Sequence, residues 1–468
     1  MEEIRFGTDG WRAILADQFT FDNVRQIAQA VSEYLIAKNQ TSAGIAVSYD
    51  TRFLSSTFAR HFAEVVASND IPVLLSANYT PTPVLSFAVK NYGLSAGIMV
   101  TASHNPYFYN GIKFKGPYGG PVMNDVTSQI ESLLGFHKSA SHPELIQRNI
   151  QHIDFFPEYQ QQIEKFIKFE SLAEFREGLI VDPMAGAGCG FIDKLLQTSG
   201  LHFESIFSYP DPYFGNRLPE PIPKNLEVLS RTVRNKKASL GLALDGDADR
   251  FGAVDGSGEF VELHDVMPLF LEHLIKSKKL SGKVVRTTSL ATTVDMLARE
   301  LKCEVLEVPV GFKNVTERMI GDDVLIGGEE SGGFGYKGHL PERDGILSVL
   351  LLLELLGEQQ TDIRELVAHL REKYGPFSYE RIDRYHDIED LHRRLQQLRK
   401  NPPDQIAGVT VSKVNLIDGL KLYFGENTWM LIRVSQTEPL VRIYVAAPDR
   451  NLVKKILHSG LKLMTGKK

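Results

Sequence analysis

The stretch AGIMVTASHNP, residues 96–106, joins a short apolar run to a polar loop, and this junction decides the fold class. The same transition recurs in LGLALDGDADR, residues 240–250, and in DVLIGGEESGG, residues 323–333. Amphipathic helical patterns such as FDNVRQIAQAVSEYLIAKN separate the apolar runs. Strand and helix patterns that alternate in this way predict α/β domains with parallel or mixed sheets covered by helices. Ligands gather at the carboxyl ends of such strands, so the polar loops are the places to search for a site.

A different pattern begins after about Tyr374. Residues 386–400 form a charged helical pattern, residues 408–447 alternate with period two, and residues 450–464 return to a helical pattern. This order predicts a small α+β domain with an antiparallel sheet. Together with three α/β blocks it gives four domains, which we place at residues 1–153, 154–256, 257–372 and 373–468.

Composition excludes several classes of protein. The 468 residues carry a net charge of −6 without a basic tract, which argues against nucleic-acid binding. The most apolar run, residues 346–356, is too short to cross a bilayer and contains Glu354, so it predicts a buried helix. The two cysteines form no metal or redox motif, and the N-terminus has no signal-peptide pattern. We expect a soluble cytoplasmic protein with no membrane partner.

Ser103 stands at the end of the first quoted strand and has two interpretations. Its flanks, Ala102 and His104, do not form the G-x-S-x-G elbow of a hydrolase. His104 is its direct neighbour, so in an extended segment the two side chains point to opposite sides. From these residues alone, Ser103 is either a nucleophile without an obvious base or a loop cap that makes a local hydrogen bond.

The run DGDADR places Asp245, Asp247 and Asp249 at alternate positions in or just beyond a strand. Carboxylates held this close repel one another unless a cation lies among them, and hard oxygen ligands select Mg²⁺ or Ca²⁺. An EF-hand is excluded because Arg250 and Gly256 occupy the positions of its Gly and Glu. The remaining alternative is a solvated acidic turn.

Two further loops carry polar groups suited to a phosphorylated sugar. GGEESGGFG, residues 327–335, lacks the Lys of a P-loop, and its Glu329 and Ser331 could bind sugar hydroxyls. AGAGCGF, residues 185–191, is interpreted as a tight strand-to-helix turn. In RVSQTEPLVRIYV a phosphate cup is expected from the guanidinium, hydroxyl and amide donors of four residues, Arg433, Ser435, Thr437 and Arg442. The alternative is a hairpin with ordinary surface arginines.

Taken together, FGTDGWR, TASHNP, DGDADR, GEESGG and RVSQTEP make the chain resemble the α-D-phosphohexomutase superfamily over essentially its whole length. The resemblance implies a heart-shaped, four-domain protein with a central cleft. It makes Ser103 the phosphoserine, which with the three aspartates binds one Mg²⁺ per chain. It also makes Glu329 and Ser331 the sugar contacts, and the four cup residues the phosphate clamp. Positive groups lining the cleft are implied at Arg12, Lys113, Arg250 and Lys313.

The implied reaction is the reversible conversion of a hexose 1-phosphate to a hexose 6-phosphate by an isomerase, with glucose 1,6-bisphosphate as intermediate and activator. His104 or Lys113 is the proton shuttle, and the sequence does not choose between them. We expect a hexose phosphate as substrate and a monomer or small homo-oligomer.

The chain departs from the family pattern at Val434 and Gln436, where many relatives have Pro and Gly, and at Gly333, where many have His. His339 is a candidate to compensate for the missing His. Glu330, third in GEESGG, favours the phosphoglucomutase/phosphomannomutase branch. The alternatives are a phosphoglucosamine mutase and a catalytically silent phosphosugar-binding protein.

Overall fold

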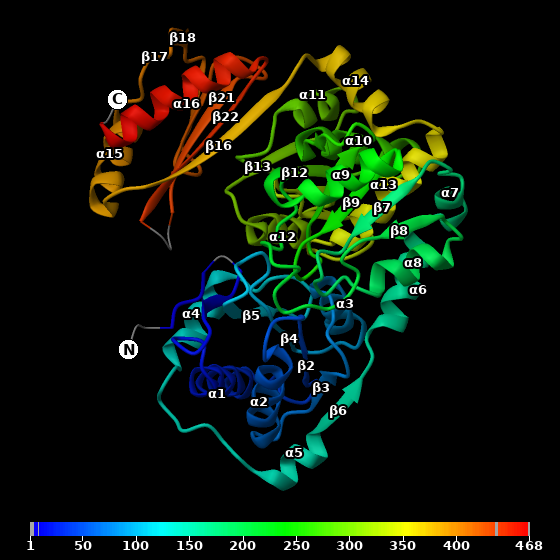
Figure 1. Ribbon diagram of the computed structural model, residues 1–468. Coiled ribbons are helices and arrows are strands. Elements are labelled where there is room, and N and C mark those ends of the chain that lie inside the picture. The colour runs from blue at the N-terminus through cyan, green and yellow to red at the C-terminus, as the bar shows by residue number, and fades with distance from the viewer. Residues whose placement is uncertain (1–3, 8, 436–438, 467–468) are drawn as a thin grey trace.

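The computed structural model describes residues 4–7, 9–435 and 439–466 and arranges them as four domains along an arc (Figure 1). The blue-to-cyan N-terminal domain and the orange-to-red C-terminal domain form the two ends of this arc, and the green and yellow domains connect them. Each domain is built around its own main sheet. The domain boundaries placed at residues 153, 256 and 372 stay a prediction.

Domain I has a six-stranded mixed sheet of order β1-β5-β4-β2-β3-β6. Its elements are β1 (Trp11–Ile14), α1 (Phe21–Ala37), β2 (Ile45–Tyr49), α2 (Ser55–Ser68), β3 (Val73–Ser76), α3 (Thr82–Asn91), β4 (Ala96–Val100), β5 (Tyr109–Lys115), α4 (Asn124–Ser132), α5 (Pro143–Asn149) and β6 (Ile150–Ile153).

Domain II has a five-stranded mixed sheet of order β11-β10-β9-β7-β8. Its elements are α6 (Phe156–Phe166), α7 (Phe169–Ala173), β7 (Leu179–Asp182), α8 (Phe191–Thr198), β8 (Phe203–Ser205), the short 3₁₀ helix η1 (Pro223–Asn225), α9 (Glu227–Lys236), β9 (Leu240–Leu244), β10 (Phe251–Asp255) and β11 (Phe260–Val261). The tight turn predicted at residues 185–191 is confirmed, because it connects β7 to α8.

Domain III has a four-stranded mixed sheet of order β13-β12-β14-β15. Its elements are α10 (Leu263–Lys276), β12 (Lys283–Thr287), α11 (Thr293–Glu300), β13 (Val305–Val308), α12 (Phe312–Gly321), β14 (Val324–Gly328), β15 (Phe334–Tyr336), α13 (Gly345–Gln359) and α14 (Ile363–Tyr374).

One topology repeats in these three domains, although no repeat is visible in the sequence. In each, the first core strand (β2, β7, β12) lies between the second and the third, all parallel, and the third strand pairs with an antiparallel partner. A glycine marks the third strand each time, at Gly97, Gly241 and Gly327. A Cβ there would come within 2.5, 2.8 and 2.3 Å of a valine side chain on the preceding helix, so helix and strand pack in close approach.

Domain IV confirms the predicted change of pattern, with an all-antiparallel sheet of order β16-β22-β21-β20-β19. Its elements are β16 (Ser378–Tyr385), α15 (Ile388–Lys400), β17 (Gln405–Ile406), β18 (Val409–Thr410), β19 (Lys413–Asn415), β20 (Leu420–Tyr423), β21 (Trp429–Val434), β22 (Leu440–Ala447) and α16 (Arg450–Thr465). The amphipathic helices α15 and α16 bury their apolar residues in the same core as one face of this sheet.

The most apolar run forms the buried helix α13, as predicted. Its charged residue, Glu354, is fully buried and accepts hydrogen bonds from the side chains of His273 and Lys278 and from the backbone N–H of Lys168. A buried carboxylate is tolerated only when it is paired in this way. Within the described ranges, none of the helices combines the length and hydrophobicity that crossing a membrane requires.

Candidate active site

The repeated topology places one polar loop at the same point of each domain, because each loop connects the third core strand to the antiparallel strand. We name them the serine loop (residues 101–108, between β4 and β5), the aspartate loop (245–250, between β9 and β10) and the glutamate loop (329–333, between β14 and β15). Equivalent hairpin connections in three domains therefore supply three of the five motifs found in the sequence.

Ser103 is fully buried, and its hydroxyl donates a hydrogen bond to Asp245 Oδ2 at 3.0 Å. Its backbone is in the left-handed region with φ of +50°, and its N–H donates to Thr101 Oγ1 at 2.9 Å. The aspartate loop approaches so closely that a Cβ on Gly246 would lie 2.5 Å from the Ser103 carbonyl oxygen. The serine is thus held against the carboxylates in a strained conformation, which is typical of functional loops.

Arg52 shapes the serine loop from behind. Its guanidinium donates to the carbonyl oxygens of four residues, at distances of 2.6 to 3.1 Å, namely Ser103, Asn105, Pro106 and Tyr109. Asp50 accepts from the same guanidinium at 3.1 Å, and the ring of Phe214 in domain II lies 4.7 Å from its centre. Both charges are buried. Sequence reasoning missed this pair, and only its short D-x-R spacing hinted at it.

Asp245, Asp247 and Asp249 are fully buried, and each offers a carboxylate oxygen within 4.8 Å of the others. They lie in a turn just beyond β9, and Ala248 in the left-handed region shows that a tight turn, rather than strand alternation, gathers them. Oδ1 of Asp247 and Oδ1 of Asp249 have no hydrogen-bond partner among the described residues. Two orphaned, buried carboxylate oxygens fit a hard divalent cation such as Mg²⁺.

Charges around the aspartates oppose one another. Burial, together with Asp249 and Asp247, raises the pKa of Asp245 well above its usual value. Burial would also raise the pKa of Asp247, but the Lys113 ammonium at 2.7 Å, the Thr82 hydroxyl and Arg343 together outweigh it and lower that pKa. A bound cation would bring the raised pKa of Asp245 down and would lower the pKa of Asp247 further.

Lys113 and Arg343 connect the aspartate loop to Asp9 near the N-terminus. Lys113 Nζ lies 2.7 Å from Asp249 and 3.1 Å from Asp9, and Arg343 Nη2 lies 2.7 and 2.5 Å from the same two carboxylates. Arg343 is buried, and its Nη1 is 3.7 Å from Glu329. Sequence reasoning found Lys113 but missed Arg343, because PERDG, residues 341–345, carries no pattern that separates it from a helix start.

The structure brings the other predicted cations to the same region. Arg12 Nη1 donates to Asn105 of the serine loop at 2.7 Å, and Arg250 Nε lies 3.8 Å from Asp249. Lys313 donates to Asn124 of domain I at 2.8 Å. The Lys313 contact crosses from domain III to domain I, whereas the Arg12 and Arg250 contacts lie within domains I and II.

His104 lies beside these cations. Burial, followed by Arg250 and Arg12, lowers the pKa of His104 well below its usual value. Within the part of the chain that the structure describes, its Nδ1 has no hydrogen-bond partner. The ring is therefore neutral at pH 7 and able to accept a proton.

In the glutamate loop, Glu329 is buried and accepts a hydrogen bond from the Gly311 N–H at 2.9 Å, with Ser331 two residues beyond it. A Cβ on Gly333 would lie 2.3 Å from Arg343 Cδ, so the arginine occupies the space that a side chain there would need. His339, the candidate to compensate for a missing His, is instead buried and bonded to Asp344 at 2.8 Å.

Arg433 and Arg442 stand directly opposite each other on β21 and β22, with Ser435 at the end of β21. Like charges in that cross-strand position are destabilising unless an anion or a carboxylate lies near them. Asp418 contacts Arg433 at 2.8 Å, and Asp383 lies 3.4 Å from Arg442. Thr437, the remaining predicted cup residue, lies outside the described residues.

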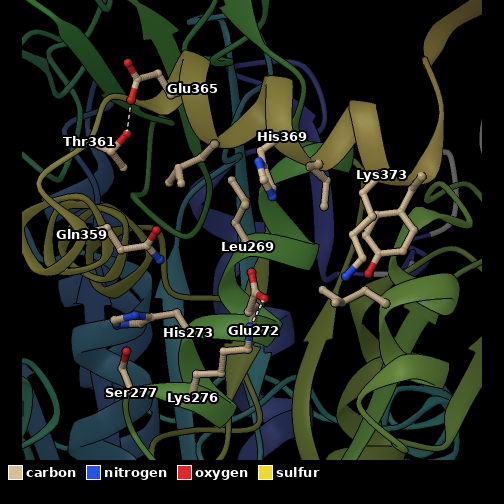
Figure 2. A pocket seen from close by; sticks show the side chains of 14 residues that line it. Leu269, Glu272, His273, Lys276, Ser277, Gln359, Thr361, Glu365, His369 and Lys373 are labelled. Carbon is tan, nitrogen blue, oxygen red and sulfur yellow. Dashed lines mark hydrogen bonds and ion pairs between the residues drawn. The ribbon is translucent and has the colours of Figure 1, made fainter.

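A separate surface pocket of about 520 Å³ lies in domain III, lined mainly by α10 and α14 (Figure 2). Lys276 on its wall is 2.5 Å from Glu272, and Lys373 is 2.6 Å from Glu300. Because each lysine is already paired with a glutamate, the pocket does not resemble a phosphate site.

Comparison with known proteins agrees with this geometry. The phosphoglucomutase/phosphomannomutase domain models match in order: domain I at residues 3–139, domain II at 157–258, domain III at 264–374 and the C-terminal domain at 391–461. A solved structure from Thermus thermophilus, assigned to the phosphomannomutases, is 34% identical, with a TM-score of 0.86 and 98% of each chain covered.

Two curated relatives also span the whole chain. A phosphoglucomutase/phosphomannomutase of Thermococcus kodakarensis is 27% identical with 98% of each chain covered, and a phosphoglucosamine/phosphogalactosamine mutase of Sulfurisphaera tokodaii is 28% identical with 99% of each covered. The chain therefore belongs to the phosphoglucomutase/phosphomannomutase family, a family of phosphohexomutases within the α-D-phosphohexomutase superfamily.

Proposed function

We propose that this protein interconverts hexose 1-phosphates and hexose 6-phosphates of glucose and mannose, with Ser103 as the phosphoryl carrier. The observation that carries the proposal is the buried Ser103 hydroxyl, held 3.0 Å from Asp245 within a group of carboxylates and cations drawn from three domains. A serine placed only to cap a loop would not need this setting.

In the proposed reaction the phosphorylated Ser103 transfers its phosphoryl group to a free hydroxyl of the bound sugar phosphate. The bond from phosphorus to the Ser103 oxygen breaks and a bond from phosphorus to the sugar oxygen forms. The hydroxyl proton passes to a base, and the Ser103 oxygen takes up a proton and becomes a hydroxyl. The resulting 1,6-bisphosphate turns end for end and returns its other phosphoryl group to Ser103. Such transfer depends on positioning and charge stabilisation more than on covalent chemistry by other residues.

Three aspartates and Ser103 would hold the metal, which we propose to be one Mg²⁺ per chain. When bound, Mg²⁺ supplies positive charge next to the transferred phosphoryl oxygens. Arg12, Lys113, Arg250 and Arg343 add the fixed positive charge that this group of anions needs. Arg343 would therefore stabilise the aspartate loop whichever sugar is bound.

His104 and Lys113 are the two candidates for the base. Lys113 is engaged by Asp9, Asp247 and Asp249, which supports a charged, holding role. His104 is neutral because its pKa is lowered, so it keeps the ability to accept a proton until the pH falls through that lowered value. Of the two groups, His104 is the one that is unprotonated, and we propose it as the acceptor of the sugar hydroxyl proton, although its lowered pKa makes it a weak base.

At the far end, Arg433, Ser435, Thr437 and Arg442 would bind the phosphate that does not react, and Lys313 would lie near it. Glu329 and Ser331 would bind the sugar hydroxyls. The charge of Glu329 is partly balanced by the Gly311 N–H and by Arg343, which favours neutral hydroxyls over an amine. Two adjacent carboxylates in one loop nevertheless suit an ammonium group, so phosphoglucosamine mutase is the second candidate.

A coupled mutase assay comparing glucose 1-phosphate, mannose 1-phosphate and glucosamine 1-phosphate tests the proposal. We expect kcat/KM for glucose and mannose to exceed that for glucosamine. A preference for glucosamine would assign the second function. Binding of all three sugars without turnover of any would instead indicate a phosphosugar-binding protein.

A further inference from the structure

Asp418 lies at the junction between domains III and IV. It is in the turn between β19 and β20, its side chain is 13% exposed, and both of its oxygens lie 2.8 Å from Arg433 Nε. The same carboxylate accepts two hydrogen bonds from domain III, from Thr288 Oγ1 at 2.9 Å and from the Val310 N–H at 2.8 Å. One side chain thus connects an arginine of the proposed cup to two loops of the neighbouring domain.

Both of these domain III loops form hydrogen bonds with the glutamate loop. Gly311, which follows Val310, donates its N–H to Glu329, and Ser289, which follows Thr288, donates its hydroxyl to Glu330. All three loops leave the carboxyl ends of the parallel strands β12, β13 and β14, at one edge of the sheet. In both loops, one residue contacts Asp418 and the next contacts a glutamate of the glutamate loop.

We propose that Asp418 is a positioning residue that couples the phosphate cup of domain IV to the sugar-binding loop of domain III. The inference rests on the proposed function, because it takes Arg433 as a phosphate ligand and Glu329 as a sugar ligand. Asp418 fixes Arg433 through a charge-assisted bond and fixes the loops behind Glu329 through two further bonds. The residues that bind the phosphate and those that bind the sugar are then held in a fixed arrangement, so fewer side chains must become ordered when the substrate binds.

Asp383 provides a matched comparison within the same domain. It lies 3.4 Å from the other cup arginine, Arg442, and accepts two hydrogen bonds from Arg381 at 2.8 and 2.9 Å. All three residues are in domain IV. Asp383 and Asp418 therefore both hold an arginine of the cup, but only the contacts described for Asp418 cross to domain III.

The experiment measures KM, kcat and thermal stability for Asp418→Asn and Asp383→Asn, each alone and combined with Glu329→Gln. Glucose 1-phosphate is the substrate, and Arg433→Ala is included as a reference. We expect Asp418→Asn to raise KM by about tenfold, in line with the loss of one charge-assisted hydrogen bond. In the Glu329→Gln background its effect should shrink at least about threefold, because residues of one network are not additive. In the double variant of Asp383→Asn and Glu329→Gln, by contrast, the fold-changes in KM of the two single variants should multiply.

Two results would overturn the coupling while leaving the proposed function intact. One is an unchanged KM in Asp418→Asn accompanied by a loss of thermal stability, which would show that Asp418 only stabilises the contact between domains III and IV. The other is a multiplicative effect of Asp418→Asn and Glu329→Gln. If instead Arg433→Ala left KM at the wild-type value, the phosphate cup itself would be wrong.

Discussion

Asp247 and Asp249 each keep one buried carboxylate oxygen that accepts no hydrogen bond from any described residue, and this is the most specific sign of a metal at residue scale. Asp247→Asn removes one anionic ligand while preserving shape, so the affinity for Mg²⁺ should fall by at least about tenfold and kcat should fall with it. Titration of the purified variant with Mg²⁺, followed by calorimetry and by activity, measures both quantities.

Asp255→Asn is the matched control, because Asp255 lies in the same domain and accepts hydrogen bonds from Ser257 and Glu259 at the turn after β10. It should leave the affinity for Mg²⁺ unchanged. Equal affinities in Asp247→Asn and the wild type would show that the three aspartates do not hold the metal.

Gly333 illustrates how one residue can depend on a distant one. Gly333→Ala places a methyl group 2.3 Å from the present position of Arg343 Cδ, so the arginine must move away from Asp9 and Asp249. We expect kcat to fall by about tenfold or more, because the charge-assisted contacts of Arg343 with Asp9 and Asp249 are weakened. Steady-state kinetics measures the loss, and Gly321→Ala, where a Cβ would meet nothing within 4 Å, is the control. Unchanged kcat in Gly333→Ala would mean that Arg343 does not support catalysis.

At the scale of elements, the serine loop is held by Arg52, which lies outside the loop and donates hydrogen bonds to its carbonyl oxygens. Arg52→Ala leaves the fully buried Asp50 without its countercharge and four carbonyl oxygens without their donor. Breaking a buried ion pair in this way costs about 3–5 kcal/mol. Urea unfolding should show a loss of that size in the free energy of unfolding.

Arg60→Ala is the comparison for this prediction, since Arg60 is 60% exposed on α2 and lies 4.0 Å from Glu64. Its loss should cost less than about 1 kcal/mol. Similar losses in the two variants would show that the Arg52 network does not shape the loop.

How much of these elements the sequence reveals depends on the kind of signal. The three strand-to-loop junctions were predicted because buried strands are apolar and their loops are not. Asp245, Asp247 and Asp249 were found because they are close together in sequence, and Lys113 because it lies in a family motif. Arg343 and Asp418 were missed, because their partners are distant in sequence and only folding brings them together.

At the scale of the whole molecule, three domains share one topology while their sequences show no repeat. What persists is the close-packed glycine in the third strand, at Gly97, Gly241 and Gly327, and the use of the following hairpin as the polar loop. Side chains elsewhere vary because many apolar residues fill a core equally well. The repeat explains why each of the three domains carries its polar loop at the same point, and Ser103, Asp245 and Arg343 show how these loops are then connected between domains.

Ser103 is proposed to carry the phosphoryl group, and measurement of the intact mass detects that group on the protein. The wild-type protein, incubated with glucose 1,6-bisphosphate, should show one phosphoryl adduct located on Ser103, and Ser103→Ala should lack both the adduct and mutase turnover while still binding sugar phosphate. Ser95→Ala, at a serine whose hydroxyl donates to the Gln40 carbonyl, should behave as the wild type. Near-normal turnover by Ser103→Ala, or an adduct on another residue, would show that Ser103 is not the phosphoryl carrier.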